Sequence, residues 1–159
     1  MILKHTFPPV HDAFSRILVL GTFPSVKSRE TLFYYGHPQN RFWRVLADVF
    51  RENVPTSIEE KTALLLRNRV ALWDVAGECE IEGSADTSIR RVVPNDIGRI
   101  LAACPIEHIY ANGHTAYALY QKLIYPDTGR EIARLPSTSP ANCRLSYEAL
   151  LTAWQVLSP

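Results

Sequence analysis

The chain has 159 residues, of which 47% are hydrophobic, and a formal net charge of +1 at pH 7. These values predict one globular domain over residues 1–159, and they exclude binding to nucleic acid through a global positive field. No run of residues approaches the ~18 apolar positions that a membrane span needs. The first residues, MILKHTFPPVHDAF, lack the apolar core and the cleavage site of a signal peptide. We therefore expect a cytoplasmic protein with no membrane partner.

The cysteines Cys79, Cys104 and Cys143 are widely spaced and form no CxxC pair, which is the spacing that zinc and iron–sulfur sites typically use. We predict reduced, buried thiols. No group of His, Asp and Glu has metal-site spacing either, so the sequence predicts neither a metal ion nor a cofactor.

The first predicted element is the apolar run RILVLGTFPS at residues 16–25, which is typical of a buried parallel strand that ends in a tight loop. Residues 26–39 are polar, aromatic and turn-like. From Asn40 onward the spacing becomes helical, because one helical face collects Phe42, Trp43, Leu46, Val49 and Phe50.

A second helix is predicted over residues 57–69, where Ser57 and Glu60 have capping-box spacing. Residues 70–77 predict a second buried strand, and residues 78–95 predict a long irregular connection, which is often functional in a compact domain. The later elements are a helix at 96–104, a strand at 106–113, a helix at 114–124, a strand that runs into a loop at 130–140, and a helix at 146–157.

Strands alternate with helices four times, an order that predicts an α/β fold. We expect a three-layer α/β/α domain with a central four-stranded parallel sheet. Ligands of such sheets bind beyond the carboxyl ends of the strands. The segments to examine are therefore GTFPS, WDVAGE, YANGHTAY and LPSTSPANC.

Several residues near the first strand end allow two interpretations. The segment 21–25 lacks the second glycine and the Gly-Lys-Ser/Thr of a phosphate loop, so a plain turn explains it. Asn40 is either a helix N-cap or a site residue. His37 either forms a turn or lines a site. Tyr34 and Tyr35 are either core residues or a surface on which a base stacks.

The other strand ends are equally open. Turn chemistry explains Asn112 and His114 as well as polar contacts do. The hydroxyl residues 137–139 stand between two prolines, and they either contact phosphates or cap a loop. Asp74 follows a strand, but no Gly-x-Ser-x-Gly elbow and no nucleophile–base pair accompany it.

Taken in chain order, LVLGTFPS, FYYGHPQNRFW and LPSTSPANC resemble the uracil-DNA glycosylase superfamily over nearly the whole chain. The middle block is the most specific, since mismatch-specific members also carry Pro-x-Asn-x-Phe-Trp after an aromatic loop. Phe23 stands where those members have a catalytic Asn, and LPSTSP lacks the histidine of the classical uracil enzymes. This pattern resembles the hypoxanthine-DNA glycosylase branch and puts strong uracil activity in doubt.

The resemblance implies a monofunctional DNA-deoxyinosine glycosylase of base excision repair, in which the amide of Asn40 orients the attacking water. It implies a monomer whose partner is DNA with a deaminated base. Backbone groups of the first loop are expected to read the base edge. The expected base pocket comprises Gly21, Thr22, Phe23, Pro24, Ser25, Tyr35, His37, Asp74 and Asn112.

The same resemblance assigns DNA contacts to one loop, which is expected to enter the minor groove. Three of its residues would hold phosphates and three would fill the vacated base stack. Arginines near the two motifs would supply local positive charge. The loop residues are Ser137, Thr138, Ser139, Pro140, Ala141 and Asn142, and the arginines are Arg41, Arg44, Arg134 and Arg144.

Three other functions stay open. A uracil or xanthine mismatch-specific glycosylase would use the same motifs. A non-catalytic nucleic-acid binding module would use the same groove, although a net charge of +1 disfavours binding that depends on phosphate neutralisation alone. A small-molecule hydrolase would need a nucleophile, a base and an orienting group, and the sequence offers no such set.

Overall fold

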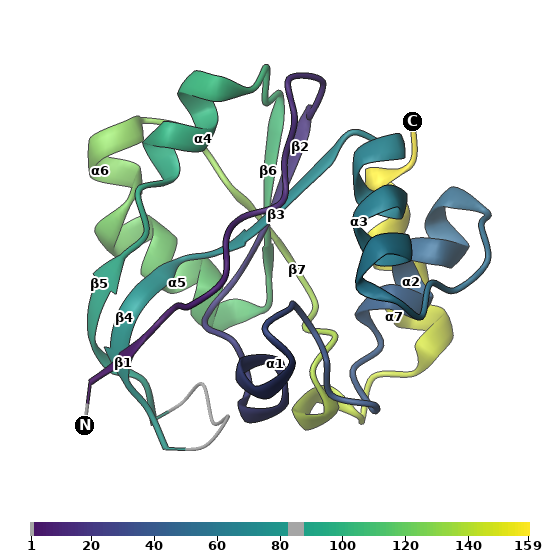
Figure 1. The fold of residues 1–159 in the computed structure, drawn as a ribbon, viewed down its shortest axis with the longest axis horizontal. Helices are drawn as coiled ribbons and strands as arrows, with labels where there is room; N and C mark the ends of the chain where they lie inside the picture. The colour runs from purple at the N-terminus through teal and green to yellow at the C-terminus, as the bar shows by residue number, and fades with distance from the viewer. Residues whose placement is uncertain (1, 83–87) are drawn as a thin grey trace.

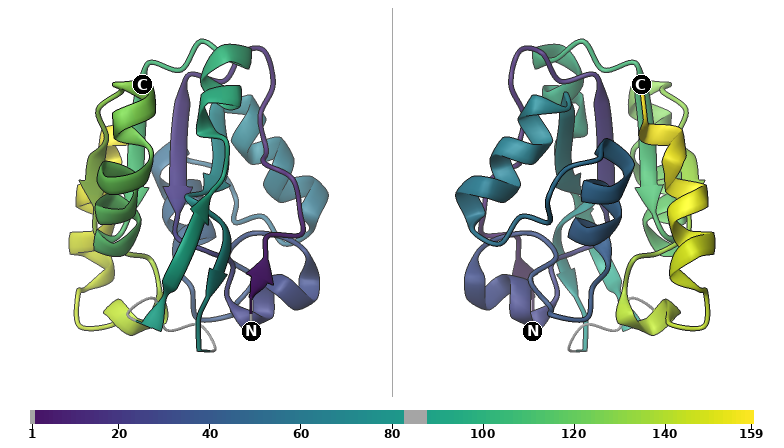
Figure 2. Two further views of the ribbon diagram at one scale, coloured as in Figure 1. Left: turned by 90° about the vertical axis from the view of Figure 1, so that its left-hand side faces the viewer. Right: turned by 90° about the vertical axis from the view of Figure 1, so that its right-hand side faces the viewer.

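The computed structural model describes residues 2–82 and 88–159. At its centre lies a parallel sheet with strand order β3-β2-β6-β7. Helices lie on both sides of this sheet (Figures 1 and 2). The predicted three-layer α/β/α architecture with four parallel strands is therefore confirmed. The strands are β2 (Ile17–Gly21), β3 (Val70–Asp74), β6 (His108–Asn112) and β7 (Ala133–Leu135).

Two groups of helices cover the two sides of the parallel sheet, and two short helical elements lie at its carboxyl end. One side of the sheet carries α2 (Phe42–Phe50), α3 (Ile58–Arg67) and α7 (Tyr147–Trp154), with the 3-10 turn η3 (Gln155–Leu157) after α7. The other side carries α4 (Ile97–Ala103), α5 (His114–Leu123) and α6 (Tyr125–Thr128). Helix α1 (Val26–Thr31) and the 3-10 turn η2 (Pro140–Asn142) lie at the carboxyl end of the sheet, at the bottom of Figure 1.

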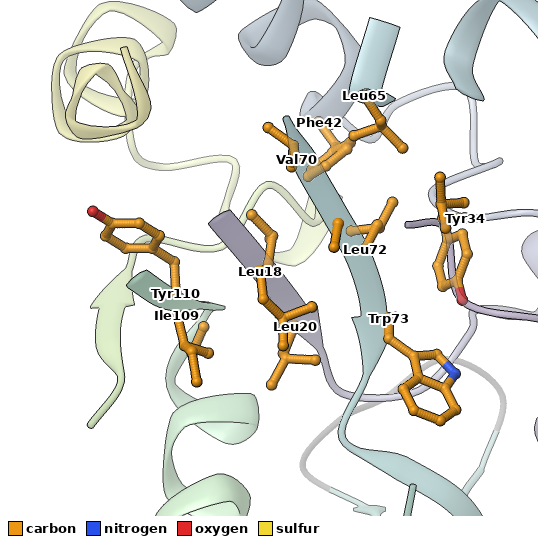
Figure 3. Close-up of a cluster of buried hydrophobic side chains, with 14 of the residues drawn as sticks. Leu18, Leu20, Tyr34, Phe42, Leu65, Val70, Leu72, Trp73, Ile109 and Tyr110 are labelled. Carbon is orange, nitrogen blue, oxygen red and sulfur yellow. The ribbon is translucent and has the colours of Figure 1, made fainter. Parts of the chain in front are cut away.

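The apolar runs of the sequence are the central strands. Leu18, Val19 and Leu20 are fully buried, because helices cover both faces of the sheet. Burial of each such side chain contributes ~1.5–3 kcal/mol relative to exposure. Figure 3 shows β2, β3 and β6 side chains packed together, with Phe42, Leu65 and Tyr34 from the flanking segments.

Two predicted local signals are confirmed. Helix α2 buries Phe42, Trp43, Leu46 and Val49 on the expected face. Helix α3 begins with a complete capping box, in which the Ser57 side chain accepts from the Glu60 N–H and the Glu60 side chain accepts from the Ser57 N–H.

A second, antiparallel sheet was not predicted. It joins β1 (Leu3–Lys4), β4 (Ala76–Glu80) and β5 (Arg90–Pro94) in the order β1-β4-β5. The predicted strand 70–77 therefore divides at Val75. The irregular connection predicted for 78–95 is wrong for residues 78–80 and 90–94, which form strands. In the first of these strands Cys79 alternates with Glu78 and Glu80 and packs inward against Phe23. Residues 83–87 of that prediction lie outside the described residues.

Further corrections concern helix α1 and one thiol. Residues 26–31 form a helix where a turn was expected, and Ser25 caps it by accepting from the Ser28 N–H. Cys79 and Cys104 are buried as predicted, but Cys143 is exposed because it follows the surface turn η2. Within the described residues, no helix is long and apolar enough to cross a membrane.

Candidate active site

A cavity of about 400 Å³ lies at the carboxyl end of the parallel sheet. It is bounded by the loop after β2, the segment before α2, the ends of β3 and β6, and the loop after β7. Every residue predicted for the catalytic position, base pocket and DNA loop lines it, except Asn142. The lining comprises Gly21, Thr22, Phe23, Pro24, Ser25, Ser28, Tyr34, Tyr35, His37, Asn40, Asp74, Asn112, Ser137, Thr138, Ser139, Pro140 and Ala141.

Asn40 lies two residues before the first residue of helix α2 and lines the cavity. Its Oδ1 accepts a hydrogen bond of 3.0 Å from the Phe42 N–H, one of the amides that has no partner within the helix. Its own N–H donates to the His37 carbonyl at 3.0 Å. The first bond restrains the rotation of the side-chain amide and leaves one lone pair on Oδ1. The N-cap position belongs to Arg41 and not to Asn40 as one interpretation had it, but the Asn40 side chain still bonds an N–H of the first helical turn, which is compatible with a role in the site.

Arg41 joins the Asn40 segment to the loop after β7. Its backbone N–H donates to the Thr138 carbonyl at 3.1 Å. Its guanidinium donates to the carbonyls of Leu145 at 2.7 Å and Asn142 at 3.0 Å. Arg41 was expected to supply positive charge to DNA, but these bonds direct its partly buried guanidinium toward the loop carbonyls.

Asn112 and Thr138 form a reciprocal pair across the end of β6. The Asn112 amide donates to the Thr138 hydroxyl at 3.0 Å, and the Asn112 Oδ1 accepts from the Thr138 N–H at 3.0 Å. Thr138 is fully buried. The side chain of Thr138 therefore does not reach a phosphate, and the Asn112 amide anchors the loop, which leaves it little capacity to read a base.

The rest of the loop is held by its own polar groups. The Ser139 hydroxyl accepts from the Ala141 N–H at 3.2 Å, and the Asn142 amide donates to the Ser137 carbonyl at 3.0 Å. Pro140 begins the 3-10 turn and Ala141 is exposed. The sequence thus builds a rigid surface turn with a small apolar residue at its tip.

Gly21 creates the space in which two polar groups meet. It pairs with Asp74 in the β2–β3 register. A side-chain carbon on residue 21 would lie less than 3.0 Å from both Asp74 Oδ1 and the Tyr35 hydroxyl. Tyr35 has a φ of +53°, which is uncommon for a non-glycine residue. One face of its ring stacks on Phe42 with centroids 4.1 Å apart.

Three carbonyls of the first loop already accept hydrogen bonds within the protein. Gly21 accepts from the Val75 N–H at 2.8 Å and Thr22 from the Ala76 N–H at 3.0 Å, while Ser25 accepts from Arg29 at 2.9 Å. The Gly21 and Thr22 carbonyls each keep one lone pair, so the expectation that backbone groups of this loop read the base edge stays a prediction. In contrast, the buried Thr22 hydroxyl has no hydrogen-bond partner among the described residues.

Phe23 and His37 occupy different depths of the wall. Phe23 is buried against Ala76 and Cys79, so no amide stands in its place to hold water. His37 is exposed at the rim, and its Nδ1 accepts from the Gln39 N–H at 3.1 Å. That bond holds His37 in a turn, and the residue also lines the cavity, so the two interpretations are compatible.

His5 was not among the predicted site residues, because no motif or periodicity marks it in the sequence. Its Nε2 lies 2.8 Å from Asp74 Oδ2, and both side chains are 4% exposed. Tyr34 had two possible interpretations, as a core residue or as a site residue. It is buried and lines the cavity, and its hydroxyl donates to the Pro8 carbonyl at 2.9 Å. Burial and then the Asp74 carboxylate raise the pKa of Tyr34, so its phenol remains neutral.

The chemistry of the cavity is that of dipoles and one carboxylate. Within the described part of the chain, no group of three His, Cys, Asp or Glu side chains can hold a metal ion. The lining residues include amides, hydroxyls and Asp74, and none of them is a lysine or a cysteine. Such a site can orient water and bind a polar ring, but it lacks a strong nucleophile.

Comparisons with known proteins point to one family. A sequence model of the Uracil DNA glycosylase superfamily matches residues 8–158. The Hypoxanthine DNA glycosylase of Methanosarcina acetivorans is 37% identical over 147 residues, which cover 91% of this chain and 92% of the relative. That of Methanosarcina barkeri is 33% identical over 153 residues and covers 95% of each. The solution NMR structure of a Methanosarcina acetivorans protein named as a candidate uracil DNA glycosylase has a TM-score of 0.82 and 35% identity, with 99% of both chains covered.

Proposed function

The chain belongs to the uracil DNA glycosylase superfamily, and on this premise we propose that it is a monofunctional, monomeric glycosylase that releases hypoxanthine from deoxyinosine in DNA. The observation that carries the proposal is the convergence on one cavity of the Asn40 amide, the Thr22 hydroxyl and the Asp74 carboxylate. Two full-length relatives are named hypoxanthine DNA glycosylases, which supports the same substrate.

Hydrolysis needs a flipped nucleotide, an oriented water and a place for charge. Extrusion of the base from the duplex brings the sugar to the cavity. The bond between the anomeric carbon and N9 breaks, the electron pair leaves with the base, and the water oxygen bonds to the carbon while its proton passes to solvent. The Asn40 oxygen, fixed by the Phe42 N–H, accepts a hydrogen bond from that water. A neutral amide is a weak base, so positioning and electrostatic preorganisation supply the rate.

The base edge distinguishes hypoxanthine from the adenine that it replaces. Deamination turns an amidine edge into a lactam, with an N–H donor beside a C=O acceptor. An ionised carboxylate only accepts hydrogen bonds, and a hydroxyl can donate. Asp74 Oδ1 therefore suits the N1–H of hypoxanthine, and the Thr22 hydroxyl suits its O6. Adenine presents a lone pair at N1, which the carboxylate repels.

The loop of residues 137–142 is proposed to support the DNA once the base has left the stack. Its rigid turn places Pro140 and the exposed Ala141 at the cavity mouth. Apolar groups that fill the vacated stack offset part of the cost of base extrusion.

The test is single-turnover cleavage of duplexes that carry inosine, xanthine, uracil, a thymine mismatch or only normal bases, with alkali to reveal abasic sites. We expect fast cleavage at inosine, slower or no cleavage at uracil, and none at adenine. Asn40→Ser, purified in the same way, is the control for a contaminating glycosylase, because serine keeps a capping oxygen but has no amide. No cleavage at any deaminated base would refute the proposal, and faster cleavage at uracil than at inosine would overturn the substrate assignment.

A further inference from the structure

The N-terminal segment passes behind the cavity wall. Strand β1 pairs with β4, and the His5 N–H continues this pairing by donating to the Gly77 carbonyl at 2.8 Å. Figure 1 shows this segment running alongside β4 and then across β3. His5 is thereby placed next to the end of β3, 69 residues away from Asp74 in sequence.

His5 contacts three separate walls of the cavity without lining it. Its Nε2 is 2.8 Å from Asp74 Oδ2. Its ring lies edge-on to Phe23 with centroids 6.1 Å apart, and tilted against Tyr34 at 5.9 Å. All three partners line the cavity. One buried side chain therefore supports the carboxylate and two aromatic surfaces from behind.

The hydrogen bond between His5 and Asp74 decides which carboxylate oxygen faces the cavity. An ionised carboxylate has no donor, so the imidazole N–H must donate to Oδ2. The other oxygen, Oδ1, lies over Gly21 beside the Tyr35 hydroxyl. The Asp74 carbonyl is held separately by the Asn95 amide at 2.9 Å. Backbone and side chain of Asp74 are thus both fixed, and Oδ1 is the oxygen left for a ligand.

We infer that His5 is a positioning residue for base selection, which holds the Asp74 carboxylate turned so that Oδ1 accepts the lactam N–H of the bound base. The inference rests on the proposed function, because it needs a base in this cavity. Without the imidazole, the Asp74 side chain loses the hydrogen bond that fixes its rotation, and Oδ1 is no longer directed at the lactam N–H.

The effect falls mainly on base capture. A departing base carries negative charge, so it gains little from a carboxylate in the transition state. We therefore expect the half-saturating enzyme concentration for an inosine duplex to rise more than the maximal single-turnover rate falls.

The experiment compares three substitutions of different reach. His5→Gln places an amide N–H near the position of Nε2. The side chain of His5→Asn is too short for its amide to reach Asp74. His5→Phe keeps an aromatic ring but has no hydrogen-bond donor. His5→Phe and His5→Asn should raise the half-saturating concentration about tenfold or more, the scale of a lost hydrogen bond to a charged group. His5→Gln should stay within about threefold of the wild type. Affinity for a duplex with an abasic-site analogue, which has no base to read, should be unchanged in all three.

The double variant separates positioning from a purely structural role. In an Asp74→Asn background, His5→Phe should change the half-saturating concentration less than about twofold, because the group it acts through is gone. Any of three results would overturn the inference. The half-saturating concentration could rise equally in the glutamine and asparagine variants, or the affinity for the abasic-site analogue could fall in the same proportion. The effects of His5→Phe and Asp74→Asn on the half-saturating concentration could also add in the double variant. A wild-type protein that cleaves no deaminated base would instead refute the proposed function. If the phenylalanine variant does not fold, the comparison of glutamine with asparagine decides alone.

Discussion

Replacement of Gly21 by alanine tests the geometry of the cavity at its most crowded point. The added carbon would lie less than 3.0 Å from Asp74 Oδ1 and from the Tyr35 hydroxyl. Neither neighbour can move freely, since His5 holds Asp74 at 2.8 Å and Tyr35 stacks on Phe42 at 4.1 Å. Overpacking of this kind costs ~1–3 kcal/mol. At ~2–4 °C per kcal/mol for a chain of this size, the melting temperature should fall by roughly 2–12 °C.

Activity should fall further than stability alone explains. A shift of about 1 Å at a reacting centre costs on the order of 10²-fold in rate, and Gly21→Ala displaces two groups that face the base. The assay is single-turnover cleavage of an inosine duplex at saturating enzyme and at a temperature well below the melting transition, with circular dichroism for stability.

The matched control is Gly98→Ala. Gly98 lies in helix α4, and the nearest atom to an added carbon there is Asp96 Oδ1 at 3.4 Å. Alanine in a helix is favoured over glycine by ~0.5–1 kcal/mol, so this variant should be at least as stable as the wild type and equally active. A Gly21→Ala protein with the wild-type cleavage rate would refute the placement of Asp74 and Tyr35 against the base.

Four further predictions concern the catalytic amide, the loop and metal ions. Asn40→Ala should lower the single-turnover rate by roughly 10²-fold with little change in duplex affinity. Asn40→Ser should be more stable than Asn40→Ala but equally slow. Wild-type turnover in either variant would leave Asn40 with only the structural bond to the Phe42 N–H. Arg41→Gln removes two hydrogen bonds to loop carbonyls and should lower the free energy of unfolding, measured with denaturant, by ~1.5–3 kcal/mol. Arg44 is exposed, so Arg44→Gln should lower it much less. Similar losses in the two variants would argue against Arg41 as the residue that holds the loop. Replacement of residues 139–142 by glycines should slow cleavage of inosine paired with cytosine far more than cleavage in a single strand, and equal losses on both would remove the loop from the DNA interface. Excess chelator should leave the rate unchanged, and a loss that Mg²⁺ or Zn²⁺ restores would overturn the mechanism.

The sequence by itself determined the central layers of this protein. Its apolar runs at Leu18–Leu20 and Val70–Leu72 are readable as parallel strands because a strand with both faces covered needs apolar residues at every position. The helical spacing after Asn40 and the capping box of Ser57 and Glu60 are local patterns within one or two turns. The topological rule for ligand sites then selected the strand ends, and the cavity lies there.

Only the tertiary structure decided which polar groups remain available to a ligand. Asn112 looked like a candidate for the base edge, yet both ends of its amide bond to Thr138, 26 residues away. Arg41 looked like a DNA contact, yet it bonds to carbonyls more than 100 residues along the chain. These assignments depend on partners that the fold brings together, and local sequence carries no record of them.

His5 is the clearest case of this limit. A histidine near the first strand has no periodicity or motif that marks it, and its role exists only because β1 pairs with β4 and sets it against Asp74. Short-range propensity and hydrophobic period fix the strands and helices of this chain, since those depend on neighbours within a few residues. The hydrogen-bond partner of a buried polar group depends on which distant segments the topology brings together. Those partners decide which polar groups of the cavity remain available for chemistry.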